Sequence, residues 1–433
     1  MTYPATTADR VAPVVGGRTL KPGPVGVAAA GLALGVVYLN AAIGWRQAAL
    51  FLVGGAAGVV LYHAAFGFTS AWRQLIAERR SEGLRAQMLM LAAASLVFIP
   101  ALGSGHLFGQ AVRGSVAPVG VSVAVGAFLF GVGMQIGGGC ASGTLYTSGG
   151  GNTRMLVTLA AFIAGSVIGV AHLPWWERLP ALKPISLVAT VGVWAALAVN
   201  MALFAIIALA AWWIEGRVGV GSGSDQDRIT IRSGSDRDRI RIRSVSDPGR
   251  IAQVPGHFLR GPWPLVAGAL GLAAVNIATL ALAGRPWGVT SAFALWGSKA
   301  LEAAGVQMTS WPYWATPART AELHASVFKD ITSVMDFGII LGAFAAAGLA
   351  GRFAPTWRVP ARSLTAAVLG GLLLGYGARI AYGCNIGALF SGIASSSVHG
   401  WLWFAAAFVG NIFGTRLRPL FGLRVERRVE TRA

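Results

Sequence analysis

Apolar runs of about twenty residues recur along the whole chain and alternate with shorter polar stretches. A helix needs about 20 mostly apolar residues to cross a hydrocarbon core of about 30 Å. The pattern therefore predicts ten membrane-spanning helices, with both ends of each placed to within a few residues. They lie at 24–40, 47–66, 86–103, 117–136, 154–173, 190–214, 262–283, 333–350, 362–379 and 400–416.

The composition agrees with this pattern. The 433 residues are 55% hydrophobic and 12% charged, with a mean hydropathy of +0.62. A soluble protein of this length could not cover its surface with so few charges. The 59 glycines suit close packing between helices in lipid. We therefore expect an all-α polytopic membrane protein.

The net charge of +19 sets the expected orientation. Lys and Arg gather in cytoplasmic loops, and the short loops on the side of the N-terminus are the richer in basic residues. We expect an inner-membrane protein with both termini cytoplasmic, a tail at 1–23 and a basic tail at 417–433. No nucleic-acid recognition motif is present, so we read the basic residues as topology signals rather than as a nucleic-acid surface.

Residues 215–261 interrupt the apolar pattern. They contain a tandem repeat with a period of eleven residues, SGSDQDR at 222–228 and SGSDRDR at 233–239. Low complexity, mixed charge and a lack of aromatic residues in the repeat indicate a disordered cytoplasmic linker. A role in binding a partner or lipid is a less favoured alternative. The linker separates a first membrane half, 24–214, from a second, 262–416.

The two halves share sequence motifs. Residues 131–146 read GVGMQIGGGCASGTLY, and residues 375–390 read GYGARIAYGCNIGALF, which aligns the only two cysteines. Each half also has a GxTSA motif, at 67–71 and 288–292. Five crossings separate the starts of the two repeats, and an odd number inverts the second one. Inverted repeats with glycine-interrupted segments are typical of secondary transporters, so we expect short re-entrant helices at the two cysteine turns to meet near the midplane.

The chemistry of these turns suits a small anion. Glycine-rich turns expose backbone N–H groups, and the positive end of a helix attracts negative charge. A thiol is a soft, weak donor that fits a sulfur atom of the ligand. The candidate binding residues are Cys140, Cys384, Gly139, Gly383, Asn385, Thr69, Ser70, Thr290, Ser291, Thr144 and Arg379.

Plainer interpretations remain open for several of these residues. A single intramembrane cysteine is usually a small apolar residue, although the pairing across the repeat favours function. The Thr and Ser residues of the GxTSA motifs are as well explained as helix caps, and Arg379 as a topology or salt-bridge residue. Asp336 is either a proton relay or a residue in water at a helix end. The cysteines match no zinc spacing, so we expect no metal or other cofactor.

The motifs together resemble the YeeE/YedE family of sulfur transporters. The resemblance rests on the GGC turn at 138–140, the string YGCNIGALFSG at 382–392, SVHGW at 397–401 and the two TSA motifs. It implies an hourglass of helices around central re-entrant segments, and thiosulfate or a related sulfur or selenium species as cargo. Many relatives carry a further cysteine beside the TSA motif, where this chain has Gly67 and Gly288.

We therefore expect a transporter of a small sulfur-containing anion such as thiosulfate, with no enzymatic activity and with a cytoplasmic sulfur-carrier protein as a possible partner. Two alternatives stay open. One is a membrane sulfurtransferase that holds a persulfide on cysteine, although no His or Asp lies in motif with either cysteine. The other is a non-transporting membrane partner of a sulfur or selenium relay complex.

Overall fold

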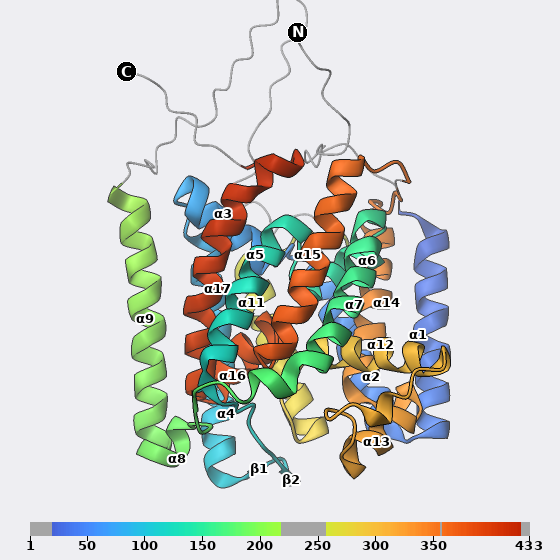
Figure 1. Cartoon of the computed structure of the whole chain (residues 1–433). Helices are drawn as coiled ribbons and strands as arrows, with labels where there is room; N and C mark the ends of the chain where they lie inside the picture. Colours follow the sequence, from blue (N-terminus) through green and yellow to red (C-terminus); the bar gives the residue numbers. More distant parts are fainter. Residues whose placement is uncertain (1–19, 218–256, 356, 426–433) are drawn as a thin grey trace, which may run out of the picture.

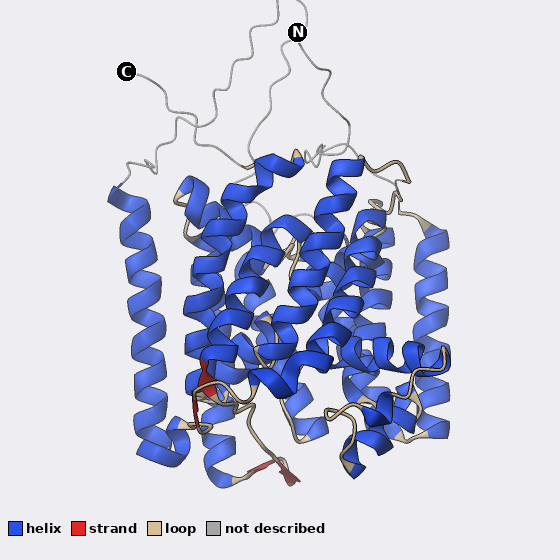
Figure 2. Ribbon diagram, viewed as in Figure 1, coloured by secondary structure: helices blue, strands red, loops and turns tan. Residues whose placement is uncertain are grey.

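The computed structural model describes residues 20–217, 257–355 and 357–425. In this part of the chain almost all regular structure is helical, and the strands are two short antiparallel pairs near one end of the helix bundle (Figure 2). Nine segments of the described residues are long and apolar enough to span a membrane. The predicted fold class, an all-α polytopic membrane protein, is confirmed.

The elements follow one another along the chain as below. They are α1 (Pro22–Ala42), α2 (Trp45–His63), α3 (Phe68–Glu78), α4 (Glu82–Ser104), β1 (His106–Leu107), β2 (Gln110–Ala111), β3 (Val119–Gly120), α5 (Val121–Gly137), α6 (Ala141–Gly149), α7 (Thr153–Trp176), β4 (Ala181–Leu182), α8 (Leu187–Val191), α9 (Val193–Arg217), α10 (His257–Arg260), α11 (Leu265–Ala283), α12 (Thr290–Ala303), η3 (Met308–Ser310), α13 (Pro317–His324), η4 (Val327–Lys329), α14 (Ile331–Leu349), α15 (Ala361–Ile380), η5 (Asn385–Phe390), α16 (Ser391–Ala394), α17 (Val398–Leu417) and η6 (Arg418–Phe421).

Each of the ten predicted segments coincides with a long helix, in chain order α1, α2, α4, α5, α7, α9, α11, α14, α15 and α17. Nine of them belong to the membrane-length apolar spans. The tenth, α17, is 20 residues long but carries polar side chains such as His399, Asn411 and Arg416, which lower its apolar character. Most of the predicted linker, at 218–256, and most of both predicted tails lie outside the described residues.

The structure differs from the sequence prediction in one helix boundary and in one additional helix. The fourth helix begins at Val121 instead of 117, because the preceding residues Val119 and Gly120 pair with Leu182 and Ala181 in a short antiparallel ladder. Pro118 also disfavours helical geometry at the residue before it. The sequence predicts no helix between the spans 262–283 and 333–350, yet this stretch holds α12, which lies across the bundle instead of along it (Figure 1).

The centre of the bundle is built by glycine-mediated helix packing. The main contacts are α7 against α15, α17 against α5, α5 against α15 and α2 against α14. A Cβ atom added at Gly370 of α15 would overlap the backbone of Gly137 in α5, and one at Gly342 of α14 would overlap Gly55 in α2. Backbones this close gain van der Waals contact that lipid cannot replace.

Helices α1 and α9 lie at the two sides of the bundle in Figure 1, and both are poorly buried, with 11% and 17% of their apolar windows covered. The start of α1, the end of α9 and the segment that follows α17 all lie at the same end of the bundle (Figure 1). The start of α1 is tied there by the Lys21 amide, which donates to the carbonyl of Gly348 at 3.1 Å. The described chain ends therefore share one face.

Candidate functional site

Cys140 begins the short helix α6 and is almost fully buried, with 2% of its surface exposed. Its Sγ atom accepts a hydrogen bond from the Gly143 amide at 3.4 Å and lies 3.5 Å from the Ser142 hydroxyl. The Thr144 hydroxyl donates to the Cys140 carbonyl at 2.8 Å. The thiol thus occupies the N-terminal cap of α6, where amide groups and the helix dipole favour negative charge. Thr144, predicted as an anion donor, uses its proton to fix this turn.

Cys384 occupies the matching position before η5 and is 1% exposed. Unlike Cys140, its side chain makes no capping hydrogen bond to the segment that follows it. The neighbouring Asn385 is fully buried, and neither its amide nitrogen nor its amide oxygen has a hydrogen-bond partner among the described residues. Buried polar atoms are normally paired, so an orphaned amide beside the thiol marks a place for a polar ligand or water. Gly383, at φ +151°, gives the turn a backbone conformation that side chains rarely adopt.

The structure brings the two cysteine segments together. Helix α6 contacts η5, although 244 residues separate the cysteines in sequence, and both thiols belong to the same buried apolar cluster. Gly139 lies directly before Cys140, and a Cβ atom there would come within 3.3 Å of the Thr144 amide nitrogen. The backbone of α6 therefore approaches this turn closely.

The GxTSA motifs start α3 and α12. Thr69 is 5% exposed and its hydroxyl has no partner among the described residues, whereas Ser70 donates to the Gly67 carbonyl at 3.2 Å. In the second half Thr290 is half-buried, and Ser291 donates to the Thr332 hydroxyl at 3.0 Å. The Thr69 hydroxyl thus lacks a partner in the described part of the chain, while both serines are engaged within the protein.

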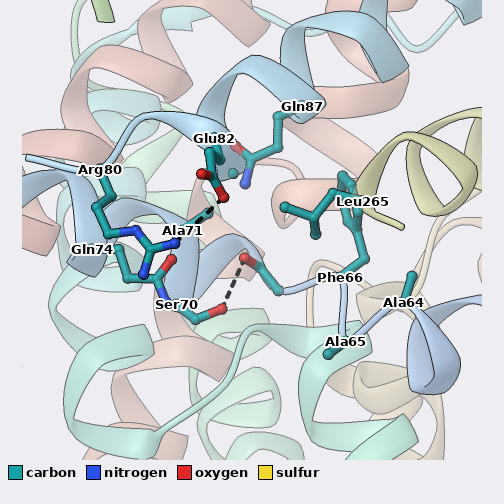
Figure 3. A pocket seen from close by; sticks show the side chains of 12 residues that line it. Ala64, Ala65, Phe66, Ser70, Ala71, Gln74, Arg80, Glu82, Gln87 and Leu265 are labelled. Atoms are coloured by element: carbon teal, nitrogen blue, oxygen red, sulfur yellow. Dashed lines mark hydrogen bonds and ion pairs between the residues drawn. The ribbon is translucent and has the colours of Figure 1, made fainter. Parts of the chain in front are cut away.

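A pocket of about 230 Å³ opens beside the first GxTSA motif. Figure 3 shows Ser70, Gln74 and Gln87 around it, with Arg80 and Glu82 forming an ion pair at 3.5 Å. We call this the Gly67 pocket. Its lining residues are Ala64, Ala65, Phe66, Gly67, Ser70, Ala71, Gln74, Arg80, Glu82, Gly83, Gln87 and Leu265.

Arg379 lies on the last turn of α15, five residues before Cys384. Its Nη1 donates to the Tyr313 hydroxyl at 3.1 Å, and its guanidinium lies 5.2 Å from the centre of the Tyr313 ring. The side chain therefore engages the segment between α12 and α13, and neither its hydrogen bond nor its cation–π contact involves a thiol. The role of Arg379 in binding remains a prediction, and its side chain lies at the approach to the site rather than at its centre.

Several polar residues that support the turns were missed from the sequence. Arg154 of α7 donates to the carbonyls of Gly137 and Ile136 at 2.8 and 2.9 Å, where α5 ends before Cys140. In the second half the Trp403 indole donates to the Gly383 carbonyl at 3.2 Å. Polar groups inside apolar helices are expensive and usually functional, and this was the signal that could have found them.

In each half of the chain, a hydrogen-bonded side chain connects the cysteine motif with the GxTSA motif. Gln135 donates to the Thr69 carbonyl at 3.0 Å and to Asn411 at 2.6 Å, so α5 holds the start of α3. Ser391 donates to the Trp287 carbonyl at 2.7 Å, so α16 holds the turn before α12. The GxTSA and cysteine motifs of each half are thus connected through a hydrogen-bonded side chain.

Paired thiols at the starts of short, buried helices inside a bundle of membrane-length helices define a polytopic membrane protein with a central polar site. The family comparison makes the class specific. Residues 63–413 match the family model described as Sulphur transport, and the chain belongs to this family.

Three relatives are similar to parts or most of the chain. The "Probable transporter YedE" proteins of Escherichia coli strain K12 and of Salmonella typhimurium are each 34% identical over 147 residues, 34% of this chain and 36% of the relative. The chain thus spans about a third of the length of these two relatives. The thiosulfate transporter TsuA of Spirochaeta thermophila is 24% identical over 371 residues, 83% of this chain and 95% of the relative.

Proposed function

We propose that the chain carries thiosulfate, or a sulfur-containing anion of similar size, across the inner membrane along a path through Cys140 and Cys384. Membership of the sulphur transport family supports transport of sulfur compounds, and the similarity to TsuA extends over most of both chains. The observation that supports the specific proposal is the contact between α6 and η5, the two short buried segments that Cys140 and Cys384 directly precede.

The mechanism follows from the donors at these helix starts. An anion at either turn meets backbone N–H groups and a neutral thiol, so its charge is stabilised without a buried countercharge that would hold it too tightly. Asn385 and Thr69 add neutral donors that have no partner among the described residues. The anion passes from one thiol to the other, with each S–H group directed at its terminal sulfur. No covalent bond forms, which separates this path from the sulfurtransferase alternative.

We further propose that the path lies between two inverted repeats. Under the predicted repeat α5 corresponds to α15, and α7 to α17. The packing supports this, because α7 lies against α15 while α17 lies against α5, so that each contact has its counterpart. Both termini are assigned to the cytoplasm, and the Gly67 pocket then opens on the cytoplasmic side, where a soluble sulfur-carrier protein would receive the anion.

Uptake of labelled thiosulfate into proteoliposomes tests the function. The wild-type protein should accumulate label, and Cys140→Ala and Cys384→Ala should each reduce the initial rate at least about tenfold, the factor that corresponds to about 1.4 kcal/mol. The packing cost of removing one sulfur atom is about 1 kcal/mol, so the variants should remain folded. The double variant should be no slower than the worse single variant if both thiols lie on one path.

Serine variants at both positions distinguish the role of sulfur from that of a hydrogen bond. A serine hydroxyl donates but lacks soft, polarisable sulfur. If Cys384→Ser transports as well as wild type, a donor alone is sufficient there. Full uptake by the Cys140→Ala/Cys384→Ala protein would contradict the proposed path. Mass spectrometry that finds a persulfide on either cysteine after turnover would favour the sulfurtransferase.

A further inference from the structure

Asp336 is a buried carboxylic acid that the transport path above does not use. It lies in α14, has no exposed surface, and neither carboxylate oxygen has a hydrogen-bond partner among the described residues. The sequence left two interpretations open, a proton relay or a residue in water at the end of its helix. Its complete burial excludes the second.

The side chain lies on the face of α14 that meets the first cysteine helix. A Cβ atom on Gly149 of α6 would lie 3.2 Å from Ala343 and would overlap the Ile340 carbonyl. Residues spaced by four and seven share one face of a helix, so Asp336 lies on the same face as Ile340 and Ala343. Since α6 begins at Cys140, this face of α14 runs along the helix that the first thiol caps.

The other faces of α14 are occupied by different neighbours. A Cβ atom on Gly54 of α2 would lie 2.8 Å from the Met335 Cα atom, so Met335 faces α2. On the α12 side the Trp296 indole donates to Ser333 at 2.8 Å and its ring stacks on Phe337 at 5.1 Å. These contacts place Asp336 between the α2 and α12 faces, toward α6, the helix that Cys140 caps.

In the described part of the chain, no ion pair joins a cation to Asp336. Arg285, a basic residue near the start of α14, forms an ion pair with Asp330 at 3.7 Å and donates to Thr332. Asp330 in turn caps α14 through the amides of Thr332 and Ser333. Other titratable side chains lie on the elements packed against α14 and at its start. They are Cys140 and Tyr146 at α6; Cys384 before η5; Arg46, Tyr62 and His63 on α2; Tyr38 on α1; Lys299 and Glu302 on α12; Arg260 on α10; and Asp330, Lys329 and Arg285 near the start of α14.

An ionised carboxylate in this place would be costly in two ways. It would be a buried charge without a partner, which proteins normally avoid by protonation. It would also repel an anion at the adjacent cysteine turns. Protonation of Asp336 removes both costs, so proton binding and anion binding favour each other, and this coupling is reciprocal.

We propose that Asp336 is the proton-binding site that couples anion transport to the proton gradient, an inference that rests on the proposed function. A proton from the outer solution binds a carboxylate oxygen of Asp336, and the anion then binds at the cysteine turns. The anion and the proton leave on the cytoplasmic side, and Asp336 is ready for the next proton. No bond other than O–H forms or breaks, and no electron is transferred.

The sign of the pH effect follows from the coupling. Acid outside the vesicle raises the protonated fraction on the entry side and so favours anion entry. For each proton carried per anion, one unit of pH gradient allows about tenfold greater accumulation at equilibrium. A uniporter that binds no proton would show no accumulation from the pH gradient itself when the membrane potential is clamped.

The test uses Asp336→Asn, an isosteric side chain that imitates the protonated acid. In proteoliposomes with a clamped membrane potential, wild type should accumulate thiosulfate when the external buffer is more acidic than the lumen. Asp336→Asn should lose this accumulation but retain exchange of external labelled for internal unlabelled thiosulfate at equal pH. Glu302→Gln is the matched control, because it removes the same charge from a partly exposed residue of α12 that pairs with His324 of α13, and it should behave as wild type.

The outcomes separate the inference from the function on which it rests. If wild type neither accumulates nor exchanges thiosulfate, the proposed function is wrong. If wild type exchanges thiosulfate but ignores the pH gradient, or if Asp336→Asn still accumulates it in response to the gradient, coupling through Asp336 is wrong. Retained exchange in Asp336→Asn also shows that this variant is folded and binds the anion.

Discussion

At the scale of single residues, the centre of the molecule combines polar groups of two kinds. Thr144 and Ser291 have hydroxyls engaged in hydrogen bonds within the protein, and they position backbone and neighbouring helices. Asn385, Thr69 and Asp336 are buried with side-chain atoms that lack partners in the described part of the chain. Because an unpaired buried polar group costs free energy, the second kind is the better guide to where a ligand or proton binds.

The surroundings of Gly67, where the resemblance to the YeeE/YedE family leads us to expect a further cysteine, accept a side chain. Its φ of −116° is an extended conformation open to any residue. An added Cβ atom would lie 2.6 Å from the Ser70 hydroxyl oxygen, which is the end of a side chain that turns away at little cost. The absence of cysteine here is therefore not imposed by the fold.

We predict that Gly67→Cys folds with about wild-type stability and adds a third thiol at the Gly67 pocket. Its thiol should react with a small water-soluble maleimide, since Gly67 lines this pocket, whereas Cys140 and Cys384 are buried and should react slowly. If a third thiol extends the path, initial uptake of thiosulfate should rise. Labelling no faster than in wild type would show that the pocket does not reach water.

At the scale of elements, the site depends on how closely the helices that lead into the cysteine turns approach one another. Helix α5 ends at Gly137, three residues before Cys140, and it packs there against Gly370 of α15. Arg154 of α7 reaches the same point, because it donates to the Gly137 carbonyl and, at 3.2 Å, to the Ser363 carbonyl of α15. Three helices therefore fix the direction in which the first cysteine turn leaves α5.

Gly370→Ala should disturb this junction. The added methyl group would overlap the backbone of Gly137, and overpacking of this kind costs about 1–3 kcal/mol or more. We expect a lower melting temperature in detergent and reduced uptake. Gly26→Ala is the matched control, because Gly26 is an exposed glycine of α1 with no atom near its added Cβ, and it should keep wild-type stability. Equal melting temperatures for the two variants would contradict the role of the junction.

Some elements could be predicted from the sequence and others could not. Helical spans follow from apolar runs, because the bilayer thickness alone sets their length. The helix α12 did not stand out, since its 14 residues are too few to span and their contacts with α7 and α14 come from tertiary packing. The site shows the same division. The motifs located both thiols, but the engagement of Arg379 with Tyr313 and the direction of Asp336 depend on residues far away in the sequence.

At the scale of the whole molecule, the arrangement of its ends bears on orientation. The described ends of α1, α9 and η6 lie on one face of the bundle (Figure 1). The loop between α3 and α4 also lies at this end, since the Ser81 hydroxyl donates to Glu215 near the end of α9 at 2.5 Å. Basic residues cluster on this face. They include Lys21, Arg73, Arg79, Arg80, Arg85, Arg352, Arg358, Arg362, Arg416, Arg418 and Arg424.

We predict that this face is cytoplasmic, because Lys and Arg near the ends of spanning helices are retained on the cytoplasmic side. Alkaline phosphatase, which is active only in the periplasm, should be inactive when fused after residue 255 or after residue 430. A fusion after residue 113, between α4 and α5 at the opposite end, should be active and serves as the positive control. Green fluorescent protein at the same three sites should give the reverse pattern. A bundle with its ends on one face has only two orientations. An active fusion after residue 255 together with an inactive fusion after residue 113 would therefore place this face in the periplasm. The Gly67 pocket would then be the entrance for the anion instead of its exit.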